Sequence, residues 1–317
     1  MSTIQANAQT EHKRSSGRSQ PIGSRWERLV GNENFVGYTF IAPLLIGLAI
    51  FTYGPVLAAL GLSFTKGDYI STPKWIGLDN YRDLLKDELF WKSLQNTLYY
   101  VVGVVPIGLA LSLLLALALN QKLRGITFFR SIFFLPSITS SVALSLMWLW
   151  IYNPEFGVLN FLLKQIGIKG PAWLATTEWA MPAIMIMSIW RGLGYNMLIF
   201  LAGLQGVPEV YYEAADIDGA GAWSKFLHIT VPLLSPTTFM LLILSLIGAF
   251  QVFEYTYVMT QGGPLYSTLT LVLHVYNNAF RSFKMGYASA LAYVLFFILL
   301  ALTFIQFKFQ ERWVHYE

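Results

Sequence analysis

The sequence contains no cysteine, so it can form no disulfide, no thiolate metal site and no thiol nucleophile. It is also poor in charge, since 12% of its 317 residues are charged, against roughly 25% in soluble globular chains. So few charged side chains leave too little polar surface for a soluble protein. The 21 basic residues are spread along the chain instead of gathering in a stripe with aromatic residues. This distribution argues against a nucleic-acid partner.

Motifs of catalysis are missing as well. No Gly-x-x-x-x-Gly-Lys-Ser/Thr phosphate loop occurs, so the chain lacks that device for binding ATP. No Ser-His-Asp grouping or catalytic carboxylate pair stands out. The histidines show no metal-ligand spacing; they are His12, His228, His274 and His315. We therefore expect no enzyme activity in this chain, no metal site and no cofactor bound to it.

Apolar residues are abundant and come in long blocks. They make up 55% of the chain, with a mean hydropathy of +0.53. A helix needs about 20 apolar residues to cross a bilayer, and only a helix or a closed barrel can satisfy its backbone there. The blocks that are long enough cover residues 36–64, 97–119, 131–152, 181–204, 233–258 and 287–307. The sequence therefore predicts an all-α polytopic membrane protein with six transmembrane helices.

The composition predicts a polar, mostly disordered tail at residues 1–30 ahead of a transmembrane domain at 31–317. Basic residues cluster in the tail and in the short loop after the second block. They are Lys13, Arg14, Arg18, Arg25 and Arg28, then Lys122, Arg124 and Arg130. The positive-inside rule places both segments in the cytoplasm. An even number of spans then puts the C-terminus on the same side.

One connection, at residues 206–236, is unlike an ordinary linker. It reads GVPEVYYEAADIDGAGAWSKFLHITVPLLSP. We expect a helix that starts at Pro208 and carries Glu209, Glu213 and Asp216 on one face. Gly219 and Gly221 should end it, before a second short helix over 223–229 that stops ahead of Pro232. The alternative is an amphipathic loop on the lipid headgroups, but an acidic helix would be repelled by anionic lipid.

Polar side chains inside the fourth and fifth blocks predict a translocation path. Arg191 lies well inside a span, where a charge is costly and by default marks function. Spacings of three and four place Ser188, Arg191 and Tyr195 on one helical face, and Gln251, Glu254 and Tyr255 on another. The candidate path residues are Trp190, Arg191, Tyr195, Asn196, Gln251, Glu254 and Tyr255. The alternative is structural, either an Arg191–Glu254 pair or polar contacts that hold helices together.

The 206–236 loop resembles the EAA loop of binding-protein-dependent ABC importer permeases. The residues that carry the resemblance are Glu213-Ala214-Ala215, Asp218-Gly219-Ala220, Phe226, Ile229, Pro232 and Pro236. The resemblance implies the type I importer fold and a coupling helix that docks on a separate ATPase. The implied coupling residues are Glu213, Ala214, Ala215, Asp218, Gly219, Ala220, Phe226 and Pro232.

A second signature narrows the resemblance to carbohydrate permeases. Residues 260–264 read TQGGP, and Ser267-Thr268, Tyr276 and Phe280 follow before the last span. This segment is similar to the first permease subunit of maltose and glycerol-phosphate systems. The stretches at 190–196 and 204–206 resemble the same subunit.

The family implies partners and a location. These are a second, homologous permease, two ATPase subunits that use ATP and Mg, an extracytoplasmic solute-binding protein, and the plasma membrane of a bacterium or archaeon. The implied solute is a sugar or a polyol-like compound. An importer of amino acids or peptides remains an alternative because the EAA loop is shared across substrates. A stand-alone secondary transporter or an intramembrane enzyme is a third, although no internal repeat or catalytic pair is visible.

Overall fold

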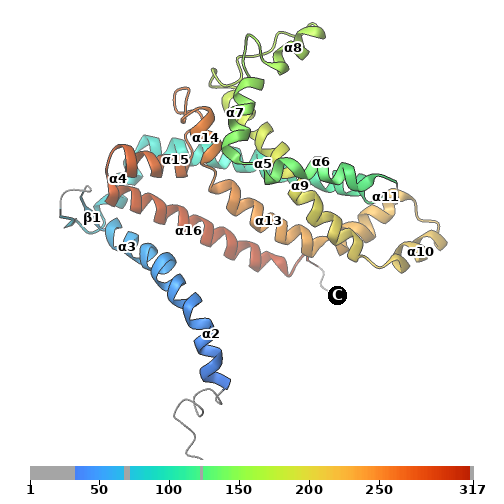
Figure 1. The fold of residues 1–317 in the computed structure, drawn as a ribbon, viewed down its shortest axis with the longest axis horizontal. Coiled ribbons are helices and arrows are strands. Elements are labelled where there is room, and N and C mark those ends of the chain that lie inside the picture. The colour runs from blue at the N-terminus through green and yellow to red at the C-terminus, as the bar shows by residue number, and fades with distance from the viewer. Residues whose placement is uncertain (1–32, 68–71, 122–123, 315–317) are drawn as a thin grey trace, which may run out of the picture. The chain divides into compact units, whose positions relative to one another are not determined.

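The computed structural model describes residues 33–67, 72–121 and 124–314, which are mostly helical (Figure 1). The predicted polar tail at 1–30 lies outside these residues. The chain forms two compact units, Met1–Ala58 and Ala59–Glu317. The predicted all-α membrane fold is confirmed, with five helices long and apolar enough to cross a membrane, or six when one bent pair is counted as a span.

The first apolar run combines three helical segments. These are α2 (Glu33–Leu48), a wide π-helical turn η1 (Ala49–Tyr53) and α3 (Gly54–Ser63). In η1 the amide of Gly54 bonds the carbonyl of Ala49, five residues back. Pro55 follows immediately, and because proline has no amide hydrogen, the usual i→i−4 ladder cannot continue through it. The interruption ahead of Pro55 therefore takes the form of a π turn.

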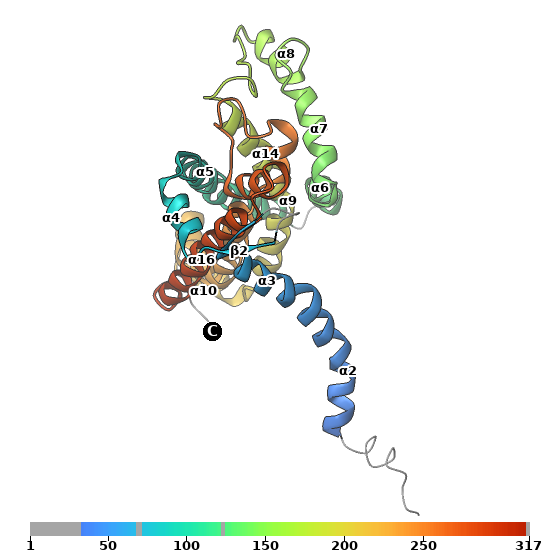
Figure 2. The same ribbon diagram turned by 90° about the vertical axis from the view of Figure 1, so that its left-hand side faces the viewer.

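The second unit is organised around α9 (Ala180–Gly206), an unbroken helix of 27 residues. It packs against α5 (Glu88–Leu119), α6 (Ile126–Ile138) and α13 (Ser235–Phe250), while α16 (Met285–Gln310) packs against α13. Figure 2 views this bundle nearly along its helices. Met187 and Met197 of α9, with Leu241 of α13, are fully buried at the centre. Close packing around α9 fixes the helices that carry the candidate path.

The third predicted span is not one straight helix. It breaks into α6 and α7 (Ser141–Ile151), which meet at an angle of 100°. Thr139 between them has extended backbone angles, so the helical ladder stops there. The break is held by tertiary contacts, because the hydroxyl of Ser137 donates to the carbonyl of Arg191 and Arg191 reaches the carbonyl of Thr139. In both views α7 leads away from the bundle (Figures 1 and 2).

The fifth predicted span is also interrupted. Helix α13 ends at Phe250, and α14 (Glu254–Met259) begins after a short non-helical stretch. The hydroxyl of Thr270 donates to the carbonyl of Val252 at 3.0 Å, which satisfies a backbone group that the break releases. The prediction that one continuous helix places Gln251, Glu254 and Tyr255 on a common face is therefore wrong.

The end of the bundle that carries α4 (Asp79–Lys86) is elaborated by short elements. Strands β1 (Thr65–Lys66) and β2 (Lys74–Trp75) pair antiparallel, with Thr65 opposite Trp75. The others at this end are α15 (Leu271–Tyr276) and the π turn η3 (Asn277–Arg281). Helix α8 (Val158–Gln165) follows α7 and lies away from this end (Figure 1). The side-chain amide of Asn96 donates to the carbonyls of Tyr266 and Leu269. These two hydrogen bonds attach the segment between the last two spans to α5.

A polar cluster strengthens the same end. The Tyr287 hydroxyl donates to Asp87 Oδ2 at 2.6 Å, and His274 Nε2 lies 3.4 Å from that oxygen. Burial opposes ionisation of Asp87, but hydrogen bonds from Tyr287 and the Leu89 amide outweigh it and hold the Asp87 pKa below its usual value. Burial also lowers the pKa of His274, against the pull of Asp87. The cluster therefore joins α5, α15 and α16 through an ionised carboxylate.

Candidate functional site: a polar cavity and a helical loop at one end of the bundle

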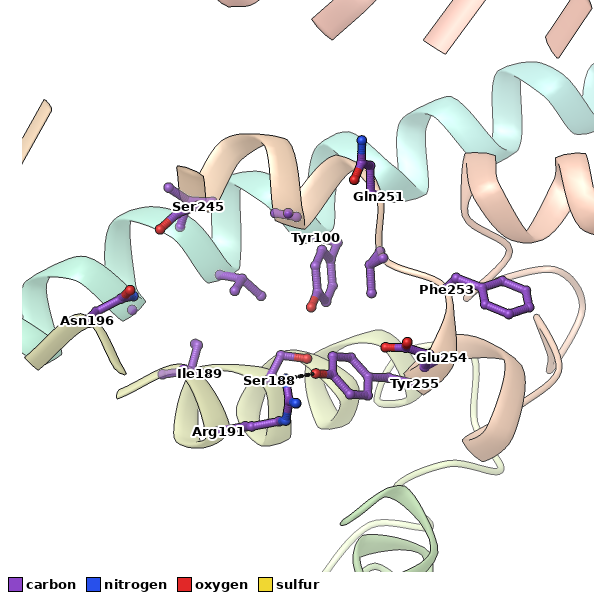
Figure 3. A pocket seen from close by; sticks show the side chains of 17 residues that line it. Tyr100, Ser188, Ile189, Arg191, Asn196, Ser245, Gln251, Phe253, Glu254 and Tyr255 are labelled. Carbon is purple, nitrogen blue, oxygen red and sulfur yellow. Dashed lines mark hydrogen bonds between the residues drawn. The ribbon is translucent and has the colours of Figure 1, made fainter. Parts of the chain in front are cut away.

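A cavity of about 330 Å³ lies between α5, α9, α13 and the start of α14 (Figure 3). Its walls combine aliphatic and glycine surface with hydroxyl, amide and charged groups. The polar and aromatic lining residues are Tyr100, Ser188, Arg191, Asn196, Ser245, Gln251, Phe253, Glu254 and Tyr255. Such a mixture in the middle of apolar helices suits a solute that needs hydrogen bonds as well as contact with rings.

Arg191 ties three elements together at one side of this cavity. Its Nη1 donates to the hydroxyl of Tyr255 at 2.7 Å, and Nη2 lies 3.5 Å from the carbonyl oxygen of Thr139. The guanidinium carbon also lies 5.9 Å from the centre of the Tyr255 ring. Helix α9 is therefore joined to α14 and to the break between α6 and α7. The alternative of an Arg191–Glu254 ion pair is not found among the described residues, because Tyr255 takes that place.

Two glycines that lie two residues apart in α9, and so on different sides of the helix, have different surroundings. Gly192 lines the cavity, and a Cβ atom added there would meet nothing within 4 Å. A Cβ on Gly194 would instead collide with the backbone of Phe133 in α6. Gly194 therefore allows α6 and α9 to touch, whereas Gly192 keeps the cavity open.

The structure brings together most of the predicted path residues. Arg191, Asn196, Gln251, Glu254 and Tyr255 line the cavity, although the last three do so around a helix break and not along one face.

Two predicted path residues lie elsewhere. Trp190 packs edge-on against Trp148 of α7, with ring centres 5.5 Å apart, and Tyr195 is exposed outside the cavity lining.

Tyr100 of α5 and Ser245 of α13 line the cavity and were not among the predicted path residues. A signal for Tyr100 exists in the sequence. Asn96, Thr97 and Tyr100 lie at helical spacing where α5 changes from a polar first part to a long apolar run. Ser245 offers no such signal, because a single serine is common in membrane helices.

The loop after α9 folds as a helix with a defined end. The helical conformation is interrupted at Val207 and Pro208, and α10 (Glu209–Ile217) follows. The amide of Ala220 bonds the carbonyl of Ala215, and the amide of Gly219 bonds that of Asp216. Gly219 has φ +73°, so these bonds form the Schellman motif that ends many helices with a left-handed glycine. The predicted glycine bend at Gly219 is confirmed.

The second half of the loop is held against the first. Lys225 at the end of α11 (Ala222–Lys225) forms an ion pair of 2.7 Å with Asp216 of α10. The Tyr212 hydroxyl lies 2.9 Å from the Thr230 hydroxyl, deeper in the loop. These cross-connections brace α10 against the chain that returns to the bundle.

The expected helix end before Pro232 is wrong. The helical path runs on through the π turn η2 (Phe226–Thr230) and α12 (Val231–Leu233), so that Pro232 lies inside it. In η2 the amide of Val231 bonds the carbonyl of Phe226, five residues back. The wide turn accommodates a proline that has no amide hydrogen, as η1 does before Pro55. The chain therefore enters α13 with only Leu234 outside a helix.

The surface of this loop carries both apolar and acidic groups. Val210, Ile217 and Trp223 are 61%, 88% and 70% exposed. Of the predicted coupling residues, Glu213, Ala214, Asp218 and Gly219 are exposed, whereas Ala215, Ala220, Phe226 and Pro232 are partly buried. Exposed apolar side chains beside carboxylates are typical of a surface that another protein covers. Helices α10 and α11 lie at the opposite end of the bundle from α4 and β1 (Figure 1).

Comparison with known proteins agrees with this arrangement. The family of binding-protein-dependent transport system inner membrane components matches residues 108–315. The probable ABC transporter permease protein YesP of Bacillus subtilis is 42% identical, over 92% of this chain and 95% of that one. The lactose transport system permease protein LacF of Rhizobium radiobacter is 39% identical, over 86% and 92%.

A solved structure is similar along nearly its whole length. It belongs to a bacterial ABC transporter involved in the import of the acidic polysaccharide alginate, with 25% identity and a TM-score of 0.79, and it covers 90% of this chain and 98% of that one. The multi-pass fold, the helical loop and these matches lead to one conclusion. The chain belongs to the family of binding-protein-dependent transport system inner membrane components, the membrane-spanning permeases of ABC importers.

Proposed function

We propose that this chain is one of two homologous permeases in an ATP-driven importer and that a sugar crosses the membrane through the cavity at Arg191 and Glu254. The observation that carries the proposal is that one unbroken helix, α9, both lines the polar cavity and leads into the α10 loop. Hydroxyl, amide and carboxylate groups beside aromatic rings suit a polyhydroxylated solute. The relative named for lactose supports a sugar, while the one named for alginate leaves the charge of that sugar open.

Two ATPase subunits supply the energy in this proposal. They bind ATP and Mg, and the exposed face of α10 and α11, with Glu213 at its centre, docks in a groove on one of them. Closure of the ATPases on ATP then displaces α10, and the braced loop passes the displacement to α9. Arg191 lies 15 positions before Gly206, which is about 22 Å along a helix that rises 1.5 Å per residue. A rigid helix of that length moves the cavity wall together with the loop.

In this proposal the sugar is delivered at the end of the bundle opposite to α10 and α11. An extracytoplasmic binding protein releases the sugar beside α4, α15 and the segment that Asn96 fastens to α5. The termini and the α10 loop then lie in the cytoplasm of a bacterium or archaeon, with the chain in its plasma membrane. The positive-inside rule and the opposite placement of the two ends support this orientation.

Affinity purification of the tagged chain in mild detergent tests the assembly. We expect a second permease and a phosphate-loop ATPase to co-purify, and Glu213→Lys to lose the ATPase while the permease pair remains. Recovery of the well-folded chain alone, under conditions that preserve other membrane complexes, would refute the proposed assembly and favour a stand-alone transporter.

Sugar uptake into proteoliposomes that contain the complete transporter tests the path. Gly192→Leu fills open cavity space and should abolish uptake with the complex intact, because a Cβ there meets no other atom. Ala202→Leu is the matched control, since Ala202 is exposed on the same helix outside the cavity lining. Unchanged uptake in Gly192→Leu would place the path elsewhere.

A further inference from the structure

The cavity contains two charged side chains among its lining residues, Arg191 and Glu254. They have opposite signs, so a simple count gives a neutral site. The two groups are nevertheless not equivalent, because Arg191 makes contacts with the protein whereas Glu254 is left open to the cavity.

Arg191 is directed at the protein. Nη1 donates to Tyr255, Nη2 approaches the carbonyl of Thr139, and the guanidinium lies near the Tyr255 ring. Its Nε is buried and has no hydrogen-bond partner among the described residues. A buried atom cannot reach a solute, and the other nitrogens hold the two helix breaks in place. Its N–H donors therefore serve the scaffold.

Glu254 is directed at the cavity. Its side chain is exposed, and no hydrogen bond or ion pair to it occurs among the described residues. In Figure 3 its carboxylate points toward the space beside the rings of Tyr100 and Tyr255. It stands at the first position of α14, directly after the break in the fifth span. The acceptor that faces the solute is therefore a full negative charge.

Given the proposed sugar path, we infer that this cavity takes uncharged saccharides and that Glu254 excludes glycans that carry carboxylate or phosphate groups. A carboxylate accepts hydrogen bonds from two sugar hydroxyls, and such charge-assisted bonds are the strong ones. The Glu254 charge taken alone would disfavour a solute anion about 5 Å away by roughly two orders of magnitude at an effective dielectric constant near 20. The hydroxyls of Tyr100, Ser188 and Ser245 and the amides of Asn196 and Gln251 supply neutral partners for the rest of the sugar.

The test uses the complete transporter with its binding protein in proteoliposomes. Uptake of labelled lactose and of neutral arabinose and galactose oligosaccharides is compared with that of trigalacturonate, oligoguluronate and glycerol 3-phosphate. We expect the wild type to import an uncharged sugar. Glu254→Gln should slow import of that sugar at least ten-fold at saturating binding protein, since it loses charge-assisted bonds. ATP hydrolysis stimulated by the binding protein should persist, so that more ATP is consumed per sugar.

Glu155→Gln is the matched control, because Glu155 is exposed and lies outside the cavity lining. Saturable import of an acidic or phosphorylated glycan by the wild type would overturn the inference and leave the proposed sugar path standing. Unchanged sugar import in Glu254→Gln would also overturn it. Import of an amino acid or peptide with no saccharide transported would refute the proposed function itself.

Discussion

Gly219 ends helix α10, and its replacement by valine tests whether the shape of the 206–236 loop matters for the proposed coupling. A Cβ there would meet no atom within 4 Å, so crowding plays no part. The cost comes from φ +73°, a left-handed conformation that disfavours other residues by about 1–2 kcal/mol and β-branched residues most. That cost lowers the population of the native bend by roughly 5- to 30-fold relative to competing loop shapes.

Gly221 provides a control two residues away. It has φ −70° and ψ 165°, ordinary extended angles that valine adopts readily, and its Cβ would also meet nothing within 4 Å. The two glycines therefore share exposure and chemistry and differ in backbone conformation. Gly219→Asn is intermediate, since asparagine tolerates left-handed angles better than other non-glycine residues.

The assay measures sugar uptake and the amount of assembled complex in the same membranes. We expect Gly219→Val to reduce uptake about ten-fold with the chain still inserted, Gly219→Asn to reduce it less, and Gly221→Val to leave it near the wild-type rate. Normal uptake in a well-expressed Gly219→Val variant would refute the reasoning. Equal damage from Gly221→Val would show that the loop responds to side-chain bulk and not to backbone angle.

Three further changes have outcomes that follow from the geometry. Gly194→Ala places a methyl group against the backbone of Phe133 and should lower stability by about 1–3 kcal/mol, whereas Gly192→Ala should not, as checked by thermal unfolding in detergent. Tyr255→Phe removes the hydroxyl that a guanidinium donates to and should cost about 1–3 kcal/mol in the same assay; an unchanged melting temperature would show that this bond contributes nothing. Because the pKa of His274 is lower in the folded chain than in the unfolded chain, the unfolded chain binds a proton at higher pH. The free energy of unfolding should therefore fall as the pH drops from about 7 to 5, and His274→Gln should remove most of that dependence.

The sequence alone predicted the helices and their order because bilayer-length apolar blocks leave few other structures open. It predicted the bend at Gly219 because a glycine after an acidic helical face is a local signal. Both predictions depend on properties of contiguous residues. Neither requires knowledge of what packs against the helix.

The two helix breaks, one after α6 and one after α13, depend on distant contacts instead. Pro136 and Gly248 lie three and four residues before the breaks at Thr139 and Val252. Neither residue specifies the interruption by itself, since α6 and α13 continue through them. At the first break, Arg191 approaches the carbonyl of Thr139 from 52 residues away in the sequence. At the second break, the hydroxyl of Thr270 donates to the carbonyl of Val252 from 18 residues away. The same dependence explains why Trp190 and Tyr195 lie outside the cavity: which face of α9 meets the cavity is set by its neighbours.

The exposed carboxylate of Glu254 has a consequence for newly made chains that have not yet assembled into a transporter. Glu254 lies within the apolar run Ser235–Met259, and a carboxylate in hydrocarbon costs about 2.5–3.5 kcal/mol or more. In the proposed assembly the second permease helps to keep this group from lipid, and a chain without that subunit would have to do so unaided. Newly made copies that find no partner should therefore be short-lived and cleared by membrane proteases, so that the partner's supply sets the amount of this chain in the cell.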